Sequence, residues 1–158
     1  MTQQTIDIGI PAAKLTDIVA GLSKVLADSY TLYLKTHNYH WNVVGPMFLS
    51  LHAMFEVEYT ELALAVDEIA ERIRALGAPA PASYHQFAAL TVVPEDTDLP
   101  DAQEMVRRLV SAHEATARTI RTLMPLAEGA PDQVTVDLLV RRLDVHEKTA
   151  WMLRSILA

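Results

Sequence analysis

The sequence predicts an all-α protein in which four long helices form one bundle. Three observations carry this prediction. Apolar residues recur at spacings of three and four over long stretches, which is the period of a helix with one buried face. Proline and glycine interrupt these stretches at only a few places, and no stretch beyond a few residues fits a β-strand. Apolar residues make up 51% of the chain and charged residues 21%, as in folded globular proteins.

The first helix is expected to begin near Pro11, since proline is favoured in a first helical turn. It can run to about Val43, where Gly45-Pro46 breaks it. Its apolar stripe consists of Leu15, Ile18, Val19, Leu22, Val25, Leu26 and Tyr33.

The second helix is expected from about Pro46 to Leu76, with Gly77 as its C-terminal stop. Residues 78–99 then form a long connection that contains three prolines, and we expect one short helix within it. Asp101, with Glu104 three residues later, is typical of a capping box that opens the third helix, which extends to about Ala127.

A last turn at Gly129-Ala130-Pro131 leads into the fourth helix, which carries the apolar stripe Val136, Leu139, Val140, Leu143, Trp151 and Ile156. The two short turns require antiparallel neighbours, while the long connection can cross the whole length of the bundle. One long crossover in a four-helix bundle is the ferritin-like connectivity. We expect a single domain over residues 1–158.

Composition excludes several classes of function. The chain has no cysteine, so disulfides and thiolate metal sites are excluded. No apolar run is long enough to cross a membrane, and the N-terminus lacks the features of a secretory signal, so we expect a cytoplasmic protein. The net charge of −7 repels nucleic acid and suits cations. With no basic tail at either end, direct DNA binding is not expected.

The second helix carries two pairs of potential metal ligands, His52 with Glu56 and Asp67 with Glu71. At 100° per residue these four positions fall at roughly 0°, 40°, 60° and 100° around the helix, so they share one side. Along the axis the two pairs are about 22 Å apart. Since metal ligands must lie within about 2.2 Å of the ion, one helix cannot bring both pairs to one metal.

Two antiparallel copies of this helix can do so. A twofold axis near Glu61 and Leu62 would lay Asp67 and Glu71 of one subunit beside His52 and Glu56 of its partner, twice in each dimer. The tight turn would fold His40 back close to His52. Two imidazoles with two or three carboxylates suit iron, manganese or zinc better than magnesium or calcium. None of the six histidines has glutamate three residues before it, so the Glu-x-x-His centre within one bundle is missing.

Several motifs together resemble the Dps family of mini-ferritins (DNA protection during starvation). They are KTHNYHWNV at residues 35–43, Leu51-His52, DEIAERI at residues 67–73 and HEKTAWMLR at residues 146–154. The resemblance implies a hollow dodecamer with ferroxidase sites at twofold interfaces, which oxidises Fe(II), preferentially with hydrogen peroxide rather than oxygen, and stores ferric mineral. Nucleoid association would accompany the cytoplasmic location in such a family.

Carried over by position, the resemblance implies that His40 and His52 of one subunit and Asp67 and Glu71 of the other bind iron. Glu56 stands where many members have aspartate. Trp41 matches a tryptophan beside the iron site that could donate an electron and quench radicals. The family also admits iron through acidic pores, for which the candidates here are Glu128, Asp132 and Asp137.

The same residues allow alternative interpretations. The rival function is a DNA-compacting structural protein of the same family. Asp67 and Glu71 could instead pair with Arg72 or Arg74 on an ordinary charged surface. Trp151 is expected to be a packing residue, as are most of the methionines. No sequence partner is evident for His113 and His146, so a surface or packing role is expected for them.

Overall fold

The computed structural model describes residues 5–158 and contains five helices and no strand over that range. The long helices are α1 (Ala12–Asn42), α2 (Phe48–Ala75), α4 (Ala102–Gly129) and α5 (Gln133–Ile156), and the short helix α3 (Tyr84–Leu90) lies in the long connection. The predicted all-α bundle with one crossover is therefore confirmed. None of these helices is long and apolar enough to span a membrane.

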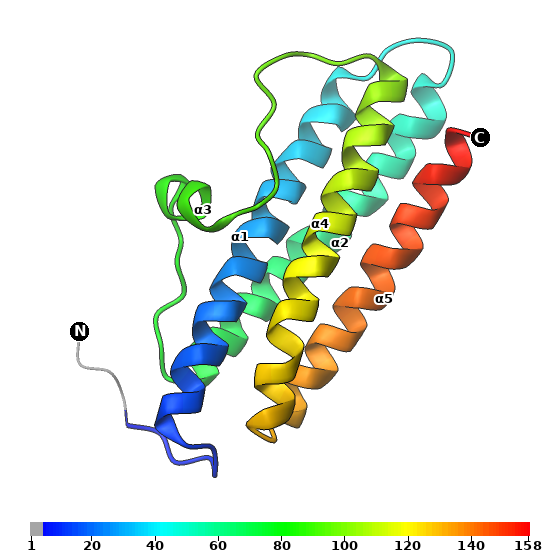
Figure 1. Ribbon diagram of the computed structural model, residues 1–158. Coiled ribbons are helices and arrows are strands. Elements are labelled where there is room, and N and C mark those ends of the chain that lie inside the picture. Colours follow the sequence, from blue (N-terminus) through cyan, green and yellow to red (C-terminus); the bar gives the residue numbers. More distant parts are fainter. Residues whose placement is uncertain (1–4) are drawn as a thin grey trace.

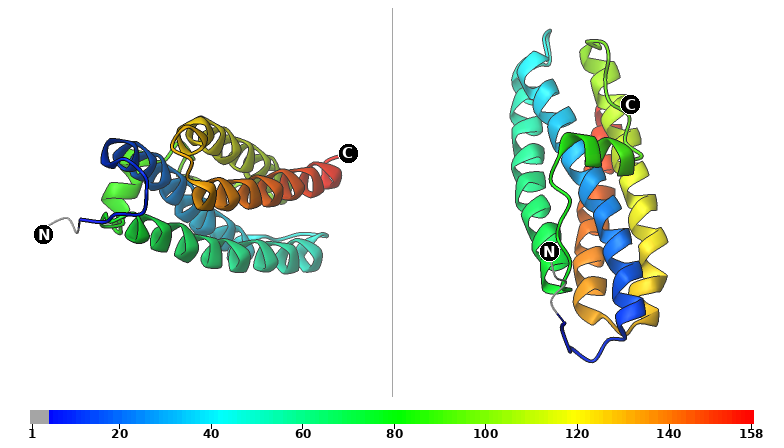
Figure 2. Two further views of the ribbon diagram at one scale, coloured as in Figure 1. Left: turned by 90° about the horizontal axis from the view of Figure 1, so that it is seen from below. Right: turned by 90° about the vertical axis from the view of Figure 1, so that its left-hand side faces the viewer.

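The four long helices run side by side, each antiparallel to the one joined to it by a short turn (Figure 1). Helix α1 packs against α2 and α4, and α5 packs mainly against α4. Seen along the bundle, α1 and α4 form one layer and α2 and α5 the other (Figure 2). The crossover climbs the outside of α1, and α3 packs on that helix (Figures 1 and 2).

Capping and turn residues explain the helix ends. The Asp101 carboxylate accepts the Glu104 backbone N–H at 2.8 Å, which starts α4 where the capping pattern predicts. Gly77 follows α2 with a φ of +86°, a left-handed backbone that favours glycine. Helix α2 begins at Phe48, two residues after the predicted Pro46, and α4 continues to Gly129 although Pro125 lies inside it.

The crossover is fastened to the bundle by two buried carboxylates. Asp96 accepts from Lys35 at 2.7 Å and Arg108 at 3.1 Å, and also from the Tyr39 hydroxyl. Burial alone would raise the pKa of Asp96, but the hydrogen bonds from Lys35 and Tyr39 outweigh it and lower the pKa. Asp28 of α1 is fully buried and accepts from the Thr91 hydroxyl and the Val92 backbone N–H, both at 2.8 Å.

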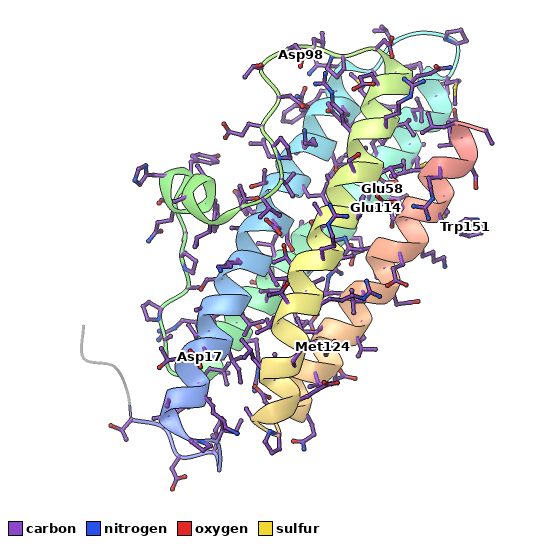
Figure 3. All side chains as sticks on the ribbon, in the orientation of Figure 1. Asp17, Glu58, Asp98, Glu114, Met124 and Trp151 are labelled. Atoms are coloured by element: carbon purple, nitrogen blue, oxygen red, sulfur yellow. The ribbon has the colours of Figure 1, made fainter. Side chains whose placement is uncertain are left out.

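Two apolar clusters fill the two halves of the bundle, and buried polar residues of α2, α4 and α5, here called the polar belt, interrupt the apolar interior. One cluster surrounds the N-terminal half of α1 and the C-terminal end of α2, and the other surrounds the α1–α2 turn. The belt comprises the buried residues Glu58, His113, Thr116, Arg142, His146 and Thr149. The expectation that Trp151 packs in the subunit is wrong: its ring is 60% exposed and projects away from α5 (Figure 3).

Candidate metal centre

His40 and His52 lie against each other across the short turn between α1 and α2. Their rings are stacked, with centroids 3.8 Å apart and an interplanar angle of 17°. Gly45 takes a φ of +107° in this turn, a left-handed conformation in which a side chain would be strained. The tight turn therefore folds His40 back onto His52, as its position in the sequence suggested.

Reciprocal hydrogen bonds fix the two imidazoles. Nδ1 of His40 lies 2.7 Å from the carbonyl oxygen of His52, and Nδ1 of His52 lies 2.7 Å from the carbonyl oxygen of His40. A carbonyl can only accept, so each Nδ1 donates, and in the neutral tautomer with this arrangement the lone pair is on Nε2. Histidines that bind metals in proteins are usually held in this way by their other nitrogen. The geometry of the pair is therefore compatible with metal binding through the two Nε2 atoms.

Aromatic rings surround the pair. Phe48 stacks on His52 with centroids 5.0 Å apart, and Tyr59 meets His40 edge-on at 5.1 Å. His37 lies between Trp41 and Tyr59, at 3.9 Å and 4.2 Å respectively. Partial burial, and then the nearby His40, lower the pKa of His37. The histidine pair therefore lies within a cluster of aromatic rings.

Glu56, Asp67 and Glu71 point outward from α2 and are exposed in the subunit. The arginines that could have neutralised the last two have other partners. Arg72 pairs with Asp132 at 2.7 Å, and Arg74 donates to the Ala78 carbonyl at 3.0 Å. Within residues 5–158 no ion pair engages any of these three carboxylates.

A single subunit does not assemble these ligands into one centre. Among residues 5–158, no group of three or more histidine, aspartate or glutamate side chains is close enough to hold a metal ion. Helix α2 is continuous from Phe48 to Ala75, so the rise of about 1.5 Å per residue separates His52 from Asp67 by about 22 Å. The subunit thus provides two half-sites at separate levels of one helix.

Exposed apolar residues share the side of α2 that carries the two half-sites. Leu49, Val57 and Leu64 are 80%, 72% and 72% exposed, and they lie on the same side of α2 as the four ligand positions. Large apolar side chains gathered on one exposed face mark a surface that contacts another protein. Both half-sites therefore lie on a face suited to a partner.

The three pore candidates lie around one surface hollow of about 440 Å³ at the α4–α5 turn. Glu128 and Asp137 are exposed there. Asp132, however, is buried: it caps α5 by accepting from the Thr135 N–H at 3.0 Å, and it pairs with Arg72. Burial would raise the pKa of Asp132, but the bonds from Thr135 and Arg72 lower it. Asp132 thus has a structural role in the subunit.

Sequence reasoning missed the polar belt. His113 and His146 are buried and meet through their Nδ1 atoms at 2.9 Å, while neither Nε2 has a partner. Burial lowers the pKa of His113 to about 3. Both carboxylate oxygens of Glu58 are also buried without a partner, and burial raises its pKa to about 8. The helical period could have found Glu58, which falls in the buried stripe between Phe55 and Leu62.

Residues 19–158 match a family model described as a ferritin-like domain. The chain is 37% identical over 140 residues to DNA protection during starvation protein 2 of Bacillus anthracis, covering 89% of this chain and 96% of that one. It is 40% identical over 154 residues to an uncharacterized low temperature-induced protein of Nostoc, covering 96% and 86% of the two chains.

Solved structures share the fold over the whole length. The Dps protein of Vibrio cholerae O1, described as a member of a broad superfamily of ferritin-like diiron-carboxylate proteins, matches with a TM-score of 0.92 and 31% identity. The match covers 100% of this chain and 99% of that one. DpsC of Streptomyces coelicolor matches with a TM-score of 0.95 and 28% identity, covering 99% and 92%.

Proposed function

The chain belongs to the Dps family of ferritin-like proteins, which store iron and protect against damage, and from this premise we propose that it is a ferroxidase whose sites form between two subunits. His40 and His52 of one subunit bind iron together with Asp67 and Glu71 of its partner. Glu56, one turn beyond His52, is the fifth candidate ligand. The smallest active unit is then a twofold dimer, and the family resemblance extends it to a hollow dodecamer.

The observation that carries this proposal is the separation of two well-prepared half-sites on one exposed face. The His40–His52 pair is fixed through its two Nδ1 atoms, which leaves both Nε2 atoms available to a ligand. Three exposed carboxylates lie on the same side of α2 without a cationic partner among residues 5–158. A twofold axis between these groups brings histidines and carboxylates together, and the exposed apolar residues of α2 cover the axis.

The mixed ligand set suits the oxidation of iron. Imidazole and carboxylate together bind Fe(II), and the carboxylates stabilise the Fe(III) that forms. Two Fe(II) ions supply the two electrons that convert one hydrogen peroxide and two protons into two water molecules. Pairing the electrons in this way avoids the release of hydroxyl radicals. Oxygen is the alternative oxidant, and zinc or manganese suits the same ligands.

Iron would reach the interior through acidic openings. Glu128 and Asp137 are exposed around the hollow at the α4–α5 turn, and repeated around a threefold axis they would concentrate cations. Asp132 belongs to the same surface through the helix cap that shapes it. A Glu128→Gln/Asp137→Asn variant is expected to slow iron uptake but leave oxidation of already bound Fe(II) unchanged.

Fe(II) oxidation followed by absorbance, with and without peroxide, tests the proposed activity. The wild type is expected to oxidise Fe(II) faster with peroxide than with dissolved oxygen alone. His52→Ala and Asp67→Ala should each lower the rate at least tenfold, since each removes a ligand. Glu95→Gln, on the exposed crossover, is the matched control. Equal rates in all four proteins would exclude this site.

The rival function, DNA compaction, makes a separate prediction. Binding through phosphates must weaken steeply as salt is raised. Because the chain carries a net charge of −7, we expect no gel-shift of duplex DNA at moderate salt. A salt-dependent shift at protein concentrations near those in a cell would support the rival function. We also propose a cytoplasmic location for the protein.

A further inference from the structure

Four of the five tyrosines and one of the two tryptophans form a single row of rings that starts at the histidine pair. Aromatic residues make up only 6% of the chain, so this concentration needs an explanation. The row is Trp41, His37, Tyr59, Tyr33, Tyr30 and Tyr84. Tyr39 is the one tyrosine outside it, and its hydroxyl donates to Asp96.

Each ring in the row lies within van der Waals reach of the next. Tyr59 stacks on His37 with centroids 4.2 Å apart and meets Tyr33 edge-on at 6.2 Å. Tyr33 lies 5.8 Å from Tyr30, and Tyr30 lies 6.4 Å from Tyr84. The row therefore follows α1 from its C-terminal end down to the crossover helix α3, on which Tyr84 sits (Figure 1).

The two ends of the row differ from ordinary core packing. At one end Tyr59 touches His40, and Trp41 is 61% exposed beside it. At the other end Tyr84 is 72% exposed. A row of phenols that begins at a redox site and ends in water can carry an oxidising equivalent, because tyrosine and tryptophan are the side chains most easily oxidised by one electron. Ring contacts at these distances allow fast electron transfer from one to the next.

We propose that this row is an electron relay that removes one-electron oxidising equivalents from the iron site and delivers them to Tyr84 at the surface. The proposal rests on the proposed ferroxidase function for the source of those equivalents. Trp41 is expected from the family resemblance to quench radicals. The relay extends this role to a defined path of rings that ends at Tyr84 on the surface.

The electrons balance as follows. Peroxide needs two electrons and two protons to become two water molecules. When only one Fe(II) is bound, the ion gives one electron, and Trp41 or Tyr59 gives the other. Tyr59 reduces the radical when it forms on Trp41; Tyr33 then reduces Tyr59, Tyr30 reduces Tyr33, and Tyr84 reduces Tyr30. Each phenol releases its proton when oxidised and regains one when reduced. The Tyr84 radical finally takes an electron from a soluble one-electron reductant, such as a thiol or ascorbate.

The test uses assembled protein loaded with less than one Fe(II) per site and treated with excess peroxide in the presence of a spin trap. Peptide mass spectrometry then locates the radical adducts. In the wild type we expect an adduct at Tyr84. Tyr33→Phe keeps the ring but removes the phenol, so the adduct at Tyr84 should fall at least tenfold and move to Tyr59 or Trp41. Trp151→Phe changes an exposed aromatic ring outside the row; it is the control and should leave the Tyr84 adduct unchanged.

Fe(II) oxidation measured in the same samples separates the two proposals. If the relay is wrong, iron oxidation stays normal and Tyr33→Phe leaves the Tyr84 adduct unchanged, because Tyr84 is then oxidised directly from solution. If the ferroxidase proposal is wrong, His52→Ala changes neither iron oxidation nor any adduct.

A second measurement needs no iron. In a Trp151→Phe background, Trp41 is the only tryptophan, and pulse radiolysis with azide oxidises it selectively. We expect the tryptophan radical to decay into a tyrosyl radical at a rate independent of protein concentration, and Tyr59→Phe to slow this transfer at least tenfold. Transfer at the same rate in Tyr59→Phe would overturn the relay.

Discussion

Each ring of the His40–His52 pair is held through its Nδ1–H, and this decides which nitrogen a metal can reach. The backbone carbonyl of the partner histidine is the acceptor in both cases, at 2.7 Å. No carboxylate is needed to set the tautomer, so the carboxylates of α2 remain available for the proposed metal site. The two histidines of the polar belt differ from this pair. His113 and His146 contact each other through their Nδ1 atoms, and both side chains are buried.

The buried Glu58 makes stability depend on pH. Burial raises its pKa to about 8, so the folded subunit keeps this carboxyl protonated at neutral pH. Below the ordinary value of 4.5, both the folded and the unfolded chain are protonated and no penalty exists. As pH rises from 4.5 towards 8, the unfolded chain ionises and the folded state loses relative stability.

Glu58→Gln removes this penalty. The variant should unfold at a higher urea concentration than the wild type, with an advantage that grows between pH 4.5 and 8 and then levels off. The difference in free energy of unfolding between the two proteins should grow by at most roughly 1.4 kcal/mol for each pH unit. Urea unfolding of metal-free protein at several pH values measures it, with the exposed Glu95→Gln as control. A pH-independent difference would mean that Glu58 is ionised inside the fold.

Among the helices, α2 has two faces with different roles, and the sequence predicts both of them. The inner stripe and the outward ligand pairs both follow from the helical period, so both could be read from spacing alone. The His113–His146 contact could not, because it depends on the register between α4 and α5, which no local pattern sets. The ion pair of Asp132 was not predicted for the same reason, since its partner Arg72 lies 60 residues away.

The start of α5 provides a test at this level. Asp132→Ala removes the helix cap and leaves the guanidinium of Arg72 without its partner. We expect a loss of about 3 kcal/mol in the free energy of unfolding. Asp137→Ala removes an exposed carboxylate that pairs with Arg141 at 3.0 Å. This variant should change the free energy of unfolding by less than about 1 kcal/mol. Urea unfolding of both variants gives the comparison, and equal losses would contradict a structural role for Asp132.

The whole molecule must be at least a dimer if the ferroxidase proposal holds. Exposed apolar residues of α2 lie between the half-sites. Among them Leu64 is nearest to the proposed twofold axis, and its side chain is 72% exposed. In a twofold dimer the two copies of this residue approach each other. The subunit fold does not use the Leu64 side chain, so assembly and folding can be separated by changing it.

Leu64→Glu should therefore dissociate the assembly while the subunit stays helical. Two buried carboxylates near one axis would destabilise the interface by roughly 3 kcal/mol or more. Analytical ultracentrifugation measures the mass, and circular dichroism the helix content. Val92→Glu, at an apolar residue of the crossover that is 59% exposed, is the control and should leave the mass unchanged. An unchanged mass for Leu64→Glu would place the contact between subunits elsewhere.

Mixing two inactive variants tests the shared site most directly. His52→Ala and Asp67→Ala are unfolded together, refolded as an equal mixture, and assayed for Fe(II) oxidation with peroxide. Half of the dimers are then mixed, and each mixed dimer rebuilds one of its two sites from the intact His52 of one chain and the intact Asp67 of the other. The mixture should recover about a quarter of the wild-type activity. If each site lies within one chain, no intact site forms, and the mixture stays as inactive as either variant refolded alone.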